Sequence, residues 1–448
     1  MTTETLVPRR VTTGALTREA ALARSQRQGE PEWLRAQRLA AWELADRLPF
    51  PTGVERAWKY LNPDRLRLES LRLPDGAVRR WPAAVRRAVH KGEQAGVLTL
   101  ADEQLLRAEL DEAVRGQGVI FTSLSTAVRI HPDLVQPHLG SVVRPDENVF
   151  VALNSAFWSG GVFVYVPREA RVTLPLHAVL AATGGSLGLF PRVLIVLERG
   201  AQVAVVEETV GGAEGTFVGA VIELVVGDEA RLHHYRAQRW QEGVQEVFFQ
   251  RARLGRHARL VTAFAGLGGE IFKGWIESEI RGTGAGSEMY GLVYGTGRQH
   301  FDVITLQDHI GDHSVSDLLI KAALRDQAQS AYYGLTRVGR TARMADANQE
   351  NRNLLLSDKA KAEADPVLEI LTSEVQRCAH GASAGPVDLE QLFYLESRGL
   401  PRPQAERLLV QGFLGEVLAR LPDEAARAIL ERAVAAKLES EVGAISDG

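Results

Sequence analysis

Apolar residues recur with two different periods along the chain, and the change of period divides it into regions. A run that opens at Pro31 places its large apolar residues at helical spacings, and the stretch 98–114 carries a similar pattern, so we expect a helix in each. Farther along, apolar and polar residues alternate as they do in strands, and near the C-terminus the helical period returns. The pattern therefore predicts a mainly helical region at 1–118, a β region at 119–385 and a helical region at 386–448.

Short turn-like segments that end in alanine recur between the expected strands. They lie at 198–201, 227–230, 255–258 and 282–285, with similar turns at 339–342 and 357–360. The first four alanines, Ala201, Ala230, Ala258 and Ala285, are separated by 29, 28 and 27 residues. A near-constant step with strands between small-residue corners indicates a solenoid of stacked β rungs, in which these alanines occupy equivalent corners. A β-sandwich also uses short strands, but it does not require equal steps.

Composition narrows the class of protein. The 448 residues include 52 Lys and Arg against 56 Asp and Glu, a net charge of −4, which argues against a general nucleic-acid binder. One cysteine excludes an internal disulfide framework and fits a reducing compartment. Neither an apolar signal segment nor a long uncharged apolar window stands out, so we expect a cytoplasmic protein that does not cross a membrane.

Glycine-rich segments invite a nucleotide-binding interpretation, but their spacing is wrong. The segment 282–286 lacks the third glycine of a dinucleotide-binding turn and falls at a rung corner. The chain contains no Gly-x4-Gly-Lys-Ser/Thr motif, so we expect no ATP hydrolysis through a P-loop and no enzymatic activity.

A polar cluster within the repeats carries candidate chemistry. His300, Asp302, Asp308 and His309 are separated by distances at which side chains bind a divalent metal or perform acid–base work. The alternative is that they are solvated or hydrogen-bonded corner residues. If Asp302, Asp308 and His309 lined an exposed groove, the solenoid would be a carbohydrate-active enzyme.

The only cysteine, Cys378, stands two residues before His380. In a strand both side chains point to one side, where they could ligate a soft metal or an iron–sulfur cluster. The plainer interpretation is a buried thiol beside a hydrogen-bonded histidine. Two ligands cannot complete a tetrahedral site, so a metal here requires ligands from a partner chain.

The local pattern around this pair also predicts secondary structure. The alternation at 367–371 indicates a strand, and Gly381, Gly385 and Pro386 are expected to break the chain after it. Asp388 can cap the helix that follows, which Gly399 would end.

The same stretch carries a specific resemblance. Its matching residues are Pro366-x-Leu368-Glu369-Ile370, Cys378-x-His380-Gly381-Ala382 and Leu392-Phe393-Tyr394-Leu395-x-Ser397-Arg398-Gly399, with a further match at 154–167. The chain resembles the SufB/SufD family of iron–sulfur cluster assembly scaffold proteins. The resemblance implies a right-handed parallel β-helix core flanked by helical regions, and it implies no catalytic site.

The resemblance also implies partners. Family members pair with a SufB- or SufD-type paralogue, or with a second copy of themselves, and bind a SufC-type ABC ATPase through their C-terminal helices. The residues implied in partner binding here are Phe393, Tyr394, Arg398, Gly399 and Phe413. Iron or a nascent iron–sulfur cluster belongs to the assembled complex, and no cofactor is implied for this chain alone.

Three departures favour the SufD branch over SufB. Ala360 stands where SufB-type chains carry a cysteine, Cys378-Ala379-His380 replaces their Glu-His-Glu, and the chain has no further cysteine. The resemblance then implies that His380 faces a SufB cysteine across a heterodimer interface, in a complex that acquires iron. A purely structural β-helix that only holds partners together is the remaining alternative.

Overall fold

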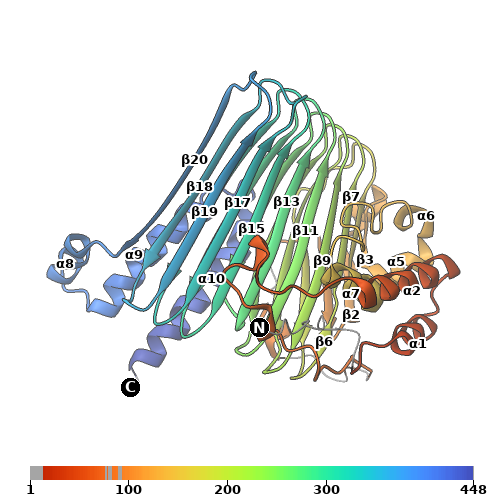
Figure 1. The fold of residues 1–448 in the computed structure, drawn as a ribbon, viewed down its shortest axis with the longest axis horizontal. Helices are drawn as coiled ribbons and strands as arrows, with labels where there is room; N and C mark the ends of the chain where they lie inside the picture. The colour runs from red at the N-terminus through yellow and green to blue at the C-terminus, as the bar shows by residue number, and fades with distance from the viewer. Residues whose placement is uncertain (1–13, 76–77, 79–82, 89–92, 447–448) are drawn as a thin grey trace, which may run out of the picture.

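Two long β-sheets face each other along the length of the molecule and form the body of the fold (Figure 1). The structure is a computed structural model that describes residues 14–75, 78, 83–88 and 93–446. The first sheet has the strand order β2-β1-β5-β8-β10-β12-β14-β16-β18-β20. The second has the order β19-β17-β15-β13-β11-β9-β7-β4-β3, with the short β6 paired to β9. Apart from the antiparallel pairs β1–β2 and β3–β4, neighbouring strands are parallel.

The strands of the first sheet are β1 (Gly96–Ala101), β2 (Gln104–Leu110), β5 (Leu176–Ala182), β8 (Gln202–Gly211), β10 (Arg231–Trp240), β12 (Arg259–Gly266), β14 (Gly286–Gly295), β16 (Val315–Leu324), β18 (Asp346–Leu355) and β20 (Arg377–Pro386). Those of the second sheet are β3 (Ile120–Ser123), β4 (Gly161–Val166), β6 (Gly188–Leu189), β7 (Arg192–Leu197), β9 (Phe217–Val226), β11 (Gln245–Leu254), β13 (Ile271–Ile280), β15 (His300–His309), β17 (Gln329–Val338) and β19 (Lys361–Ile370).

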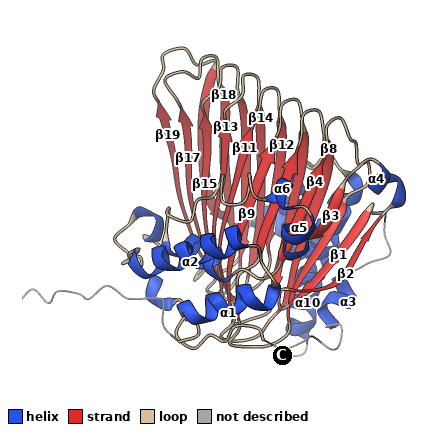
Figure 2. Cartoon of the chain, turned by 90° about the vertical axis from the view of Figure 1, so that its right-hand side faces the viewer, coloured by secondary structure: helices blue, strands red, loops and turns tan. Residues whose placement is uncertain are grey.

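The chain alternates between the two sheets, so each rung consists of one strand from each sheet joined by tight corners (Figure 2). About eight such turns build a parallel β-solenoid with helices at both ends. Inward-facing side chains of the two sheets meet in a large apolar core, which includes Val205, Leu224, Phe248 and Phe272. The mainly β, solenoid architecture expected from the repeat is therefore confirmed.

The alanine corners occupy equivalent positions, as the repeat predicted. Ala201, Ala230, Ala258 and Ala285 directly precede β8, β10, β12 and β14, whose first residues pair in register. Each alanine N–H donates to the carbonyl three residues earlier, at 3.1 to 3.3 Å, and each alanine is fully buried. The turn that ends at Ala360 has the same hydrogen bond but precedes β19, so it lies in the row of corners at the opposite ends of the strands.

The helix expected at 98–114 is wrong. The residues form the hairpin β1–β2, followed by the short helix α4 (Glu112–Gly116). Asp102 and Glu103 join the strands with φ of 46° and 68°, the left-handed pair that a two-residue hairpin turn requires. Leucines such as Leu98 and Leu100 satisfy a period of two as well as a helical one, so the apolar pattern alone did not separate the two structures.

Helices also interrupt the region after residue 119, where strands were expected. The helices α5 (Leu124–Ile130), α6 (Pro132–Val135) and α7 (Val149–Phe157) lie between β3 and β4. Eight of the nine residues of α7 are buried, so its apolar residues show no single face. A helix buried all round carries no amphipathic period, which explains why the sequence pattern did not reveal it.

The N-terminal helices cover the outer face of the second sheet. They comprise α1 (Arg18–Gln28), α2 (Glu32–Arg47) and the 3-10 turns η1 (Arg56–Trp58) and η2 (Pro63–Arg65). The short helix α3 (Ala83–Ala88) packs on the first sheet instead. Trp58 is buried between Phe150 and Trp275, with ring centroids 5.5 and 5.8 Å apart, so the aromatic segment at 55–60 anchors this layer.

The C-terminal helices follow directly after the last strand. They are α8 (Leu389–Ser397), α9 (Arg402–Leu418) and α10 (Glu424–Ser446). The apolar sides of α9 and α10 pack on the outer face of the first sheet, among residues such as Tyr235 and Leu319. Pro422 lies in the short connection between α9 and α10.

Candidate functional site

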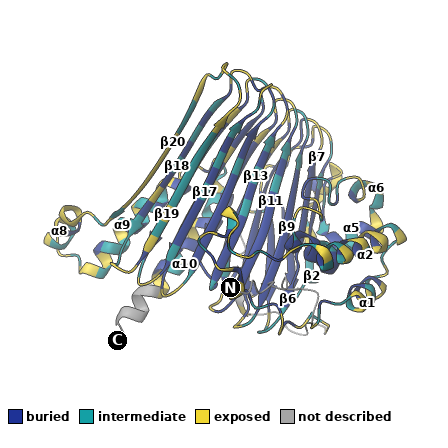
Figure 3. Cartoon of the chain, in the orientation of Figure 1, coloured by how far each residue is buried: buried dark blue, intermediate teal, exposed yellow. Residues whose placement is uncertain are grey.

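The last rung of the solenoid is open. β19 and β20 are the terminal strands of the two sheets, so each has a neighbour on one side only. Inward residues of β18 are still mostly buried, whereas every residue of β20 is exposed or half-buried (Figure 3). This end therefore presents two adjacent strand edges and the uncovered inner face of the solenoid.

Cys378 and His380 lie on the inner face of β20. They pair in register with Ala347 and Gln349 of β18, and Gln349 accepts a hydrogen bond from Thr336 of the second sheet at 2.8 Å. The side chains of Cys378 and His380 therefore point toward the space between the sheets, on one side of the strand, as the sequence predicted.

The two side chains have different surroundings. Cys378 is half-buried and packs beside Val338, Ala342 and Ala345, and burial raises the pKa of its thiol. His380 is exposed. The cysteine is therefore held as a protonated thiol in an apolar corner, whereas the imidazole is accessible to an approaching partner.

The chain break expected at Gly381, Gly385 and Pro386 is wrong for the two glycines. β20 continues through them and pairs with β18 along its whole length, ending at Pro386. Because one side of β20 is a free edge, residues that would weaken a central strand are tolerated there. Pro366 of β19, also an edge strand, is tolerated for the same reason.

α8 carries an exposed apolar surface. Asp388 caps it, accepting from the N–H groups of Glu390 and Gln391, and Gly399 follows its end with φ of 88°. Leu389, Phe393 and Tyr394 are 70%, 72% and 56% exposed. In Figure 1, α8 stands away from the solenoid beyond β20. Large apolar side chains gathered on one short helix at the surface are typical of a protein-binding site.

The remaining residues expected in partner binding differ in exposure. Arg398 and Gly399 are exposed, and the Arg398 guanidinium lies 5.2 Å from the ring centroid of Tyr394. Phe413 of α9 is half-buried, with Lys321 Nζ 4.5 Å from its ring centroid. Phe413 therefore faces the chain's own first sheet, and the exposed aromatic surface belongs to α8.

Ion pairs fix the C-terminal helices on the first sheet. Arg325 pairs with Glu406 at 2.7 Å and Lys321 with Glu416. Asp423, which directly precedes α10, accepts from Tyr235 Oη at 3.0 Å and also contacts His233. Because α9 is held at several points, it provides a fixed base from which α8 projects.

The polar cluster at 300–309 does not form a site. Asp302 is buried and pairs with Lys273 at 2.6 Å, and Asp308 pairs with Arg337 at 2.7 Å. His309 points to the opposite face of β15, inside the solenoid, where Ser314 and Ser316 lie 2.8 Å from its two ring nitrogens. Six residues of strand place Asp302 and Asp308 about 20 Å apart. The exposed groove required for a carbohydrate-active enzyme is not present among these residues.

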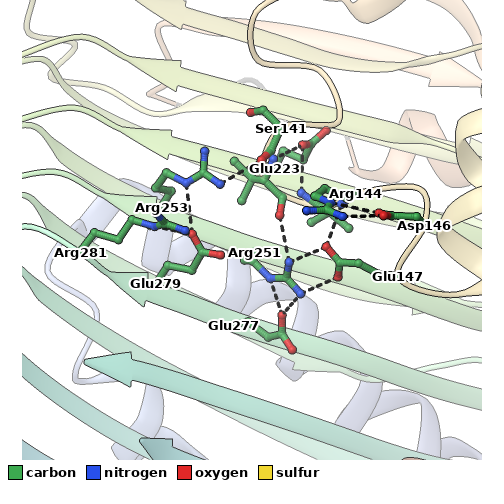
Figure 4. Close-up of polar contacts among 12 residues, drawn as sticks. Ser141, Arg144, Asp146, Glu147, Glu223, Arg251, Arg253, Glu277, Glu279 and Arg281 are labelled. Carbon is green, nitrogen blue, oxygen red and sulfur yellow. Dashed lines mark hydrogen bonds and ion pairs between the residues drawn. The ribbon is translucent and has the colours of Figure 1, made fainter. Parts of the chain in front are cut away.

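A dense polar network lies on the second sheet, and the sequence pattern did not reveal it (Figure 4). Arg251 of β11 contacts both Glu147 and Glu277, and the fully buried Glu223 pairs with Arg192 at 2.6 Å. Backbone N–H groups of the loop before α7 donate to Glu223 as well. In the sequence each of these charged residues is an isolated position in a strand or loop, so nothing indicates that they pair. Because they pair with one another in the fold, we interpret the network as structural: it holds the loop before α7 against the second sheet.

The described part of the chain contains neither a clustered metal site nor a membrane-spanning helix. Within it, no group of three or more His, Cys, Asp or Glu side chains is arranged to hold a metal ion. Among the described helices, none is long and apolar enough to cross a membrane.

Known protein families match almost the whole solenoid. A family model described as "SUF system FeS cluster assembly, SufBD core domain" matches residues 179–413, and one described as "SufBD protein N-terminal region" matches residues 87–178. The iron–sulfur cluster assembly protein SufD of Bacillus subtilis (strain 168) is 31% identical over 92% of this chain and 96% of its own length. SufB of the same organism is 27% identical over 96% of this chain and 94% of its own length.

The chain belongs to the SufBD family of iron–sulfur cluster assembly proteins. A SufBD family protein of Staphylococcus haemolyticus (strain JCSC1435) is 27% identical over 94% of the chain and 92% of its own length. Within the family the chain is most like SufD, in agreement with the three departures from SufB seen in the sequence.

Proposed function

We propose that the chain is the SufD-type subunit of a SufBCD-type complex that assembles iron–sulfur clusters. The open last rung carries the proposal, because two strand edges and an exposed histidine meet there. Unpaired N–H and C=O groups of edge strands pair readily with strands of another chain. A SufB-type paralogue with the same solenoid can continue both sheets at this end. A second copy of this chain can do the same in the absence of the paralogue.

In this complex His380 contributes one ligand to a shared iron site. An imidazole and a half-buried thiol are fewer ligands than a tetrahedral iron or cluster site requires. The partner therefore supplies the thiolates, and iron or the nascent cluster is cargo of the assembly. The chain alone holds no cofactor stably.

α8 is the docking element for the SufC-type ATPase. Its exposed Leu389, Phe393 and Tyr394 provide an apolar contact surface, and α9 holds the helix on the solenoid through ion pairs. In this proposal the ATPase performs the hydrolysis, and the chain is a non-enzymatic scaffold that acts in the cytoplasm.

Co-expression tests the proposal. A tagged chain is produced with the SufB-type and SufC-type proteins of the same genome, purified anaerobically and analysed for subunits, iron and cluster absorbance. We expect all three proteins to co-purify and cluster absorbance to appear in the complex but not on the chain alone. Failure to capture both partners would overturn the assignment. A complex that loads equal iron without this chain would favour the purely structural role instead.

A further inference from the structure

The N-terminal layer extends one stretch of chain across the outer face of the second sheet, toward the open end of the solenoid (Figure 1). We call this stretch, residues 50–67, the strap. At its start Phe50 packs on Phe150 of α7, with ring centroids 5.6 Å apart. At its end the N–H of Arg67 donates to the Gln245 side chain of β11 at 2.9 Å. Both ends of the strap are therefore held near the N-terminal helices, and its middle is the part that reaches the last rungs.

The middle of the strap is fixed to successive strands. The carbonyl of Ala57 accepts from Lys273 Nζ of β13 at 2.5 Å, and the ring centroid of Trp58 lies 4.7 Å from the same nitrogen. The guanidinium carbon of Arg56 lies 4.4 Å from the ring centroid of Tyr333, which belongs to β17. These contacts give the strap a defined path over the sheet and bring it to the strand next to β19.

The tip of the strap reaches β19 itself. Tyr60 Oη donates to Asp365 Oδ2 at 3.1 Å, and Lys59 Nζ lies 3.2 Å from the same oxygen and 2.7 Å from the Tyr60 hydroxyl. Hydrogen bonds to Tyr60 and Asp365 raise the pKa of the Lys59 ammonium, so the contact to the carboxylate is charge-assisted. The three side chains thus join parts of the chain that are 306 residues apart.

β19 is the strand of the second sheet that such a contact can influence most. It has a neighbouring strand on one side only, and its outward residues are half-buried or exposed. Asp365 stands in the middle of β19 and points outward, because Ala362 and Ala364 on the alternate positions pack against the core. Strands with few buried contacts open locally more readily than central strands do. The tip of the strap therefore holds the middle of an edge strand in place.

A contribution to the stability of the whole fold would be the simplest interpretation of these contacts. The Lys59 and Asp365 side chains are 54% and 29% exposed, however, and exposed ion pairs contribute little to global stability. Their effect is instead local, since they act on one strand at the end of the sheet. That strand is also the one whose free edge would receive a partner.

Pairing at this edge depends on the conformation of β19. An incoming strand can complete its backbone hydrogen bonds only with a β19 that is extended and in register with β17. If β19 holds this conformation for only a fraction of the time, the apparent affinity for the partner falls by the same fraction. Contacts that hold β19 in place therefore favour binding without touching the partner.

We propose that the strap is a positioning element of the pairing interface, in which Lys59 and Tyr60 hold β19 in the extended form that a partner strand recognises. The inference rests on the function proposed above, in which a SufB-type paralogue pairs at the last rung. It gives the N-terminal layer a part in partner binding, although the helices of that layer pack on other rungs.

Hydrogen exchange of the full-length chain alone tests whether the strap holds β19. Tyr60→Phe keeps the ring but removes the hydroxyl that donates to Asp365, so the amides of residues 361–370 should exchange at least about threefold faster than in the wild type. Exchange in β13 and the thermal midpoint should not change. Tyr165→Phe is the matched control, because Tyr165 Oη donates to Glu198 at 2.6 Å toward the other end of the same sheet. Unchanged exchange of residues 361–370 in Tyr60→Phe would overturn the proposal.

Binding of the SufB-type paralogue, measured by calorimetry, tests whether this restraint serves pairing. Lys59→Glu places two carboxylates together at the tip, so the affinity should fall at least about threefold. Adding Asp365→Lys restores a pair of opposite charges with their positions exchanged, and it should recover both the affinity and the slow exchange of β19. Unchanged affinity in Lys59→Glu, or no recovery in the double variant, would contradict a positioning role.

The two measurements separate this inference from the function on which it rests. A paralogue that fails to bind even the wild-type chain would contradict the proposed function, whereas the exchange of residues 361–370 would still decide whether the strap holds β19. Faster exchange in Tyr60→Phe and Lys59→Glu together with wild-type affinity for the paralogue would show that the strap restrains β19 but does not serve pairing, and the inference would then be wrong.

Discussion

Cys378 and His380 share the inner face of β20, but the two residues are suited to different roles. The thiol packs in an apolar corner that raises its pKa, whereas the imidazole is exposed at the open rung. A ligand to a shared iron must be accessible and must offer a free electron pair, and a protonated, half-buried thiol does neither well. This contrast is the reason why the proposed function gives the role toward the partner to His380.

We predict that His380→Ala lowers the iron content of the assembled complex severalfold without preventing folding or assembly. The residue is exposed and its side chain makes no hydrogen bond or ion pair with other described residues, so its removal should cost less than about 0.5 kcal/mol of stability. Cys378→Ala is the companion variant and should leave iron content close to wild type. The measurement is iron per complex and cluster absorbance after co-expression. Wild-type iron in the His380→Ala complex would show that this histidine is not a ligand.

His309 illustrates a buried histidine with a structural role. It lies inside the solenoid between two serine hydroxyls, and burial lowers its pKa from the ordinary 6.5 to about 4. The unfolded chain therefore binds a proton at a higher pH than the folded chain does. Its contribution to stability is complete above pH 6.5 and is lost as the pH falls toward 4.

We predict that wild-type stability falls between pH 7.5 and pH 5, and that His309 alone accounts for about 2 kcal/mol of the loss. His309→Gln keeps a hydrogen-bonding side chain but cannot titrate, so its stability should decline less steeply with pH. Urea unfolding at several pH values measures the difference in slope. The exposed corner residue His257 supplies the control, and His257→Gln should retain the wild-type slope. Parallel pH dependences for wild type and His309→Gln would contradict the prediction.

At the scale of elements, a helix or corner can be predicted from the sequence when a single physical requirement determines its residue pattern. The corners before β8, β10, β12 and β14 need a small buried residue, so alanine recurs there at nearly equal steps. The capped helix α8 is predictable because Asp388 and Gly399 mark its two ends locally. The hairpin at Asp102–Glu103 was not predictable in this way. Its non-glycine residues adopt left-handed φ values, and its leucines fit two periods.

The candidate site was predictable only in part for a related reason. The alternation of strand residues is sufficient by itself to place Cys378 and His380 on one face. The burial of Asp302 against Lys273, in contrast, depends on β13 lying beside β15 and on Trp58 covering the pair. Long-range pairings of this kind leave no local pattern, so Asp302, Asp308 and His309 looked like candidate chemical groups in the sequence but form structural contacts in the fold.

We predict that α8 determines capture of the SufC-type ATPase. Phe393→Ala together with Tyr394→Ala removes most of the exposed aromatic surface and should weaken capture by at least about tenfold, because buried aromatic anchors dominate protein interfaces. The solenoid should remain folded, since neither side chain is buried within the chain. Leu408→Ala, at an exposed apolar position on α9, is the matched control. Undiminished ATPase capture by the double variant, measured by calorimetry or pull-down, would place the docking surface elsewhere.

At the scale of the whole molecule, the two ends of the solenoid differ in how far other elements cover them. The N-terminal end is covered, because the antiparallel hairpin partner β2 and the strand β3 end the sheets and helices pack around them. The C-terminal end lacks such a cover, since α8 projects beyond β20 (Figures 1 and 3). A parallel solenoid with one uncovered end exposes strand edges that favour association with another chain. The asymmetry therefore supports the proposal that a partner chain pairs at the last rung.

We predict that charges on the inner face of β20 prevent pairing with the SufB-type paralogue. Ala382 and Ala384 are exposed and alternate with the outward residues of the strand, on the same face as Cys378 and His380. Ala382→Glu with Ala384→Glu would bury two unpaired carboxylates if a partner rung closed over them, and an unpaired buried charge costs about 3 kcal/mol or more. Affinity for the paralogue should fall at least about 100-fold, as judged by co-purification and light scattering.

The control for that experiment lies on the same strand. Ser383 stands between the two alanines but points to the outer face, and it is also exposed. Ser383→Glu adds a similar charge to the same strand without placing it between the paired solenoids, so it should leave the heterodimer intact. If Ser383→Glu and the alanine variants weakened pairing equally, net charge near the edge would explain the effect. If none of them weakened it, the last rung would not be the interface. Selective loss in the alanine variants is expected only when a partner covers the inner face at this end.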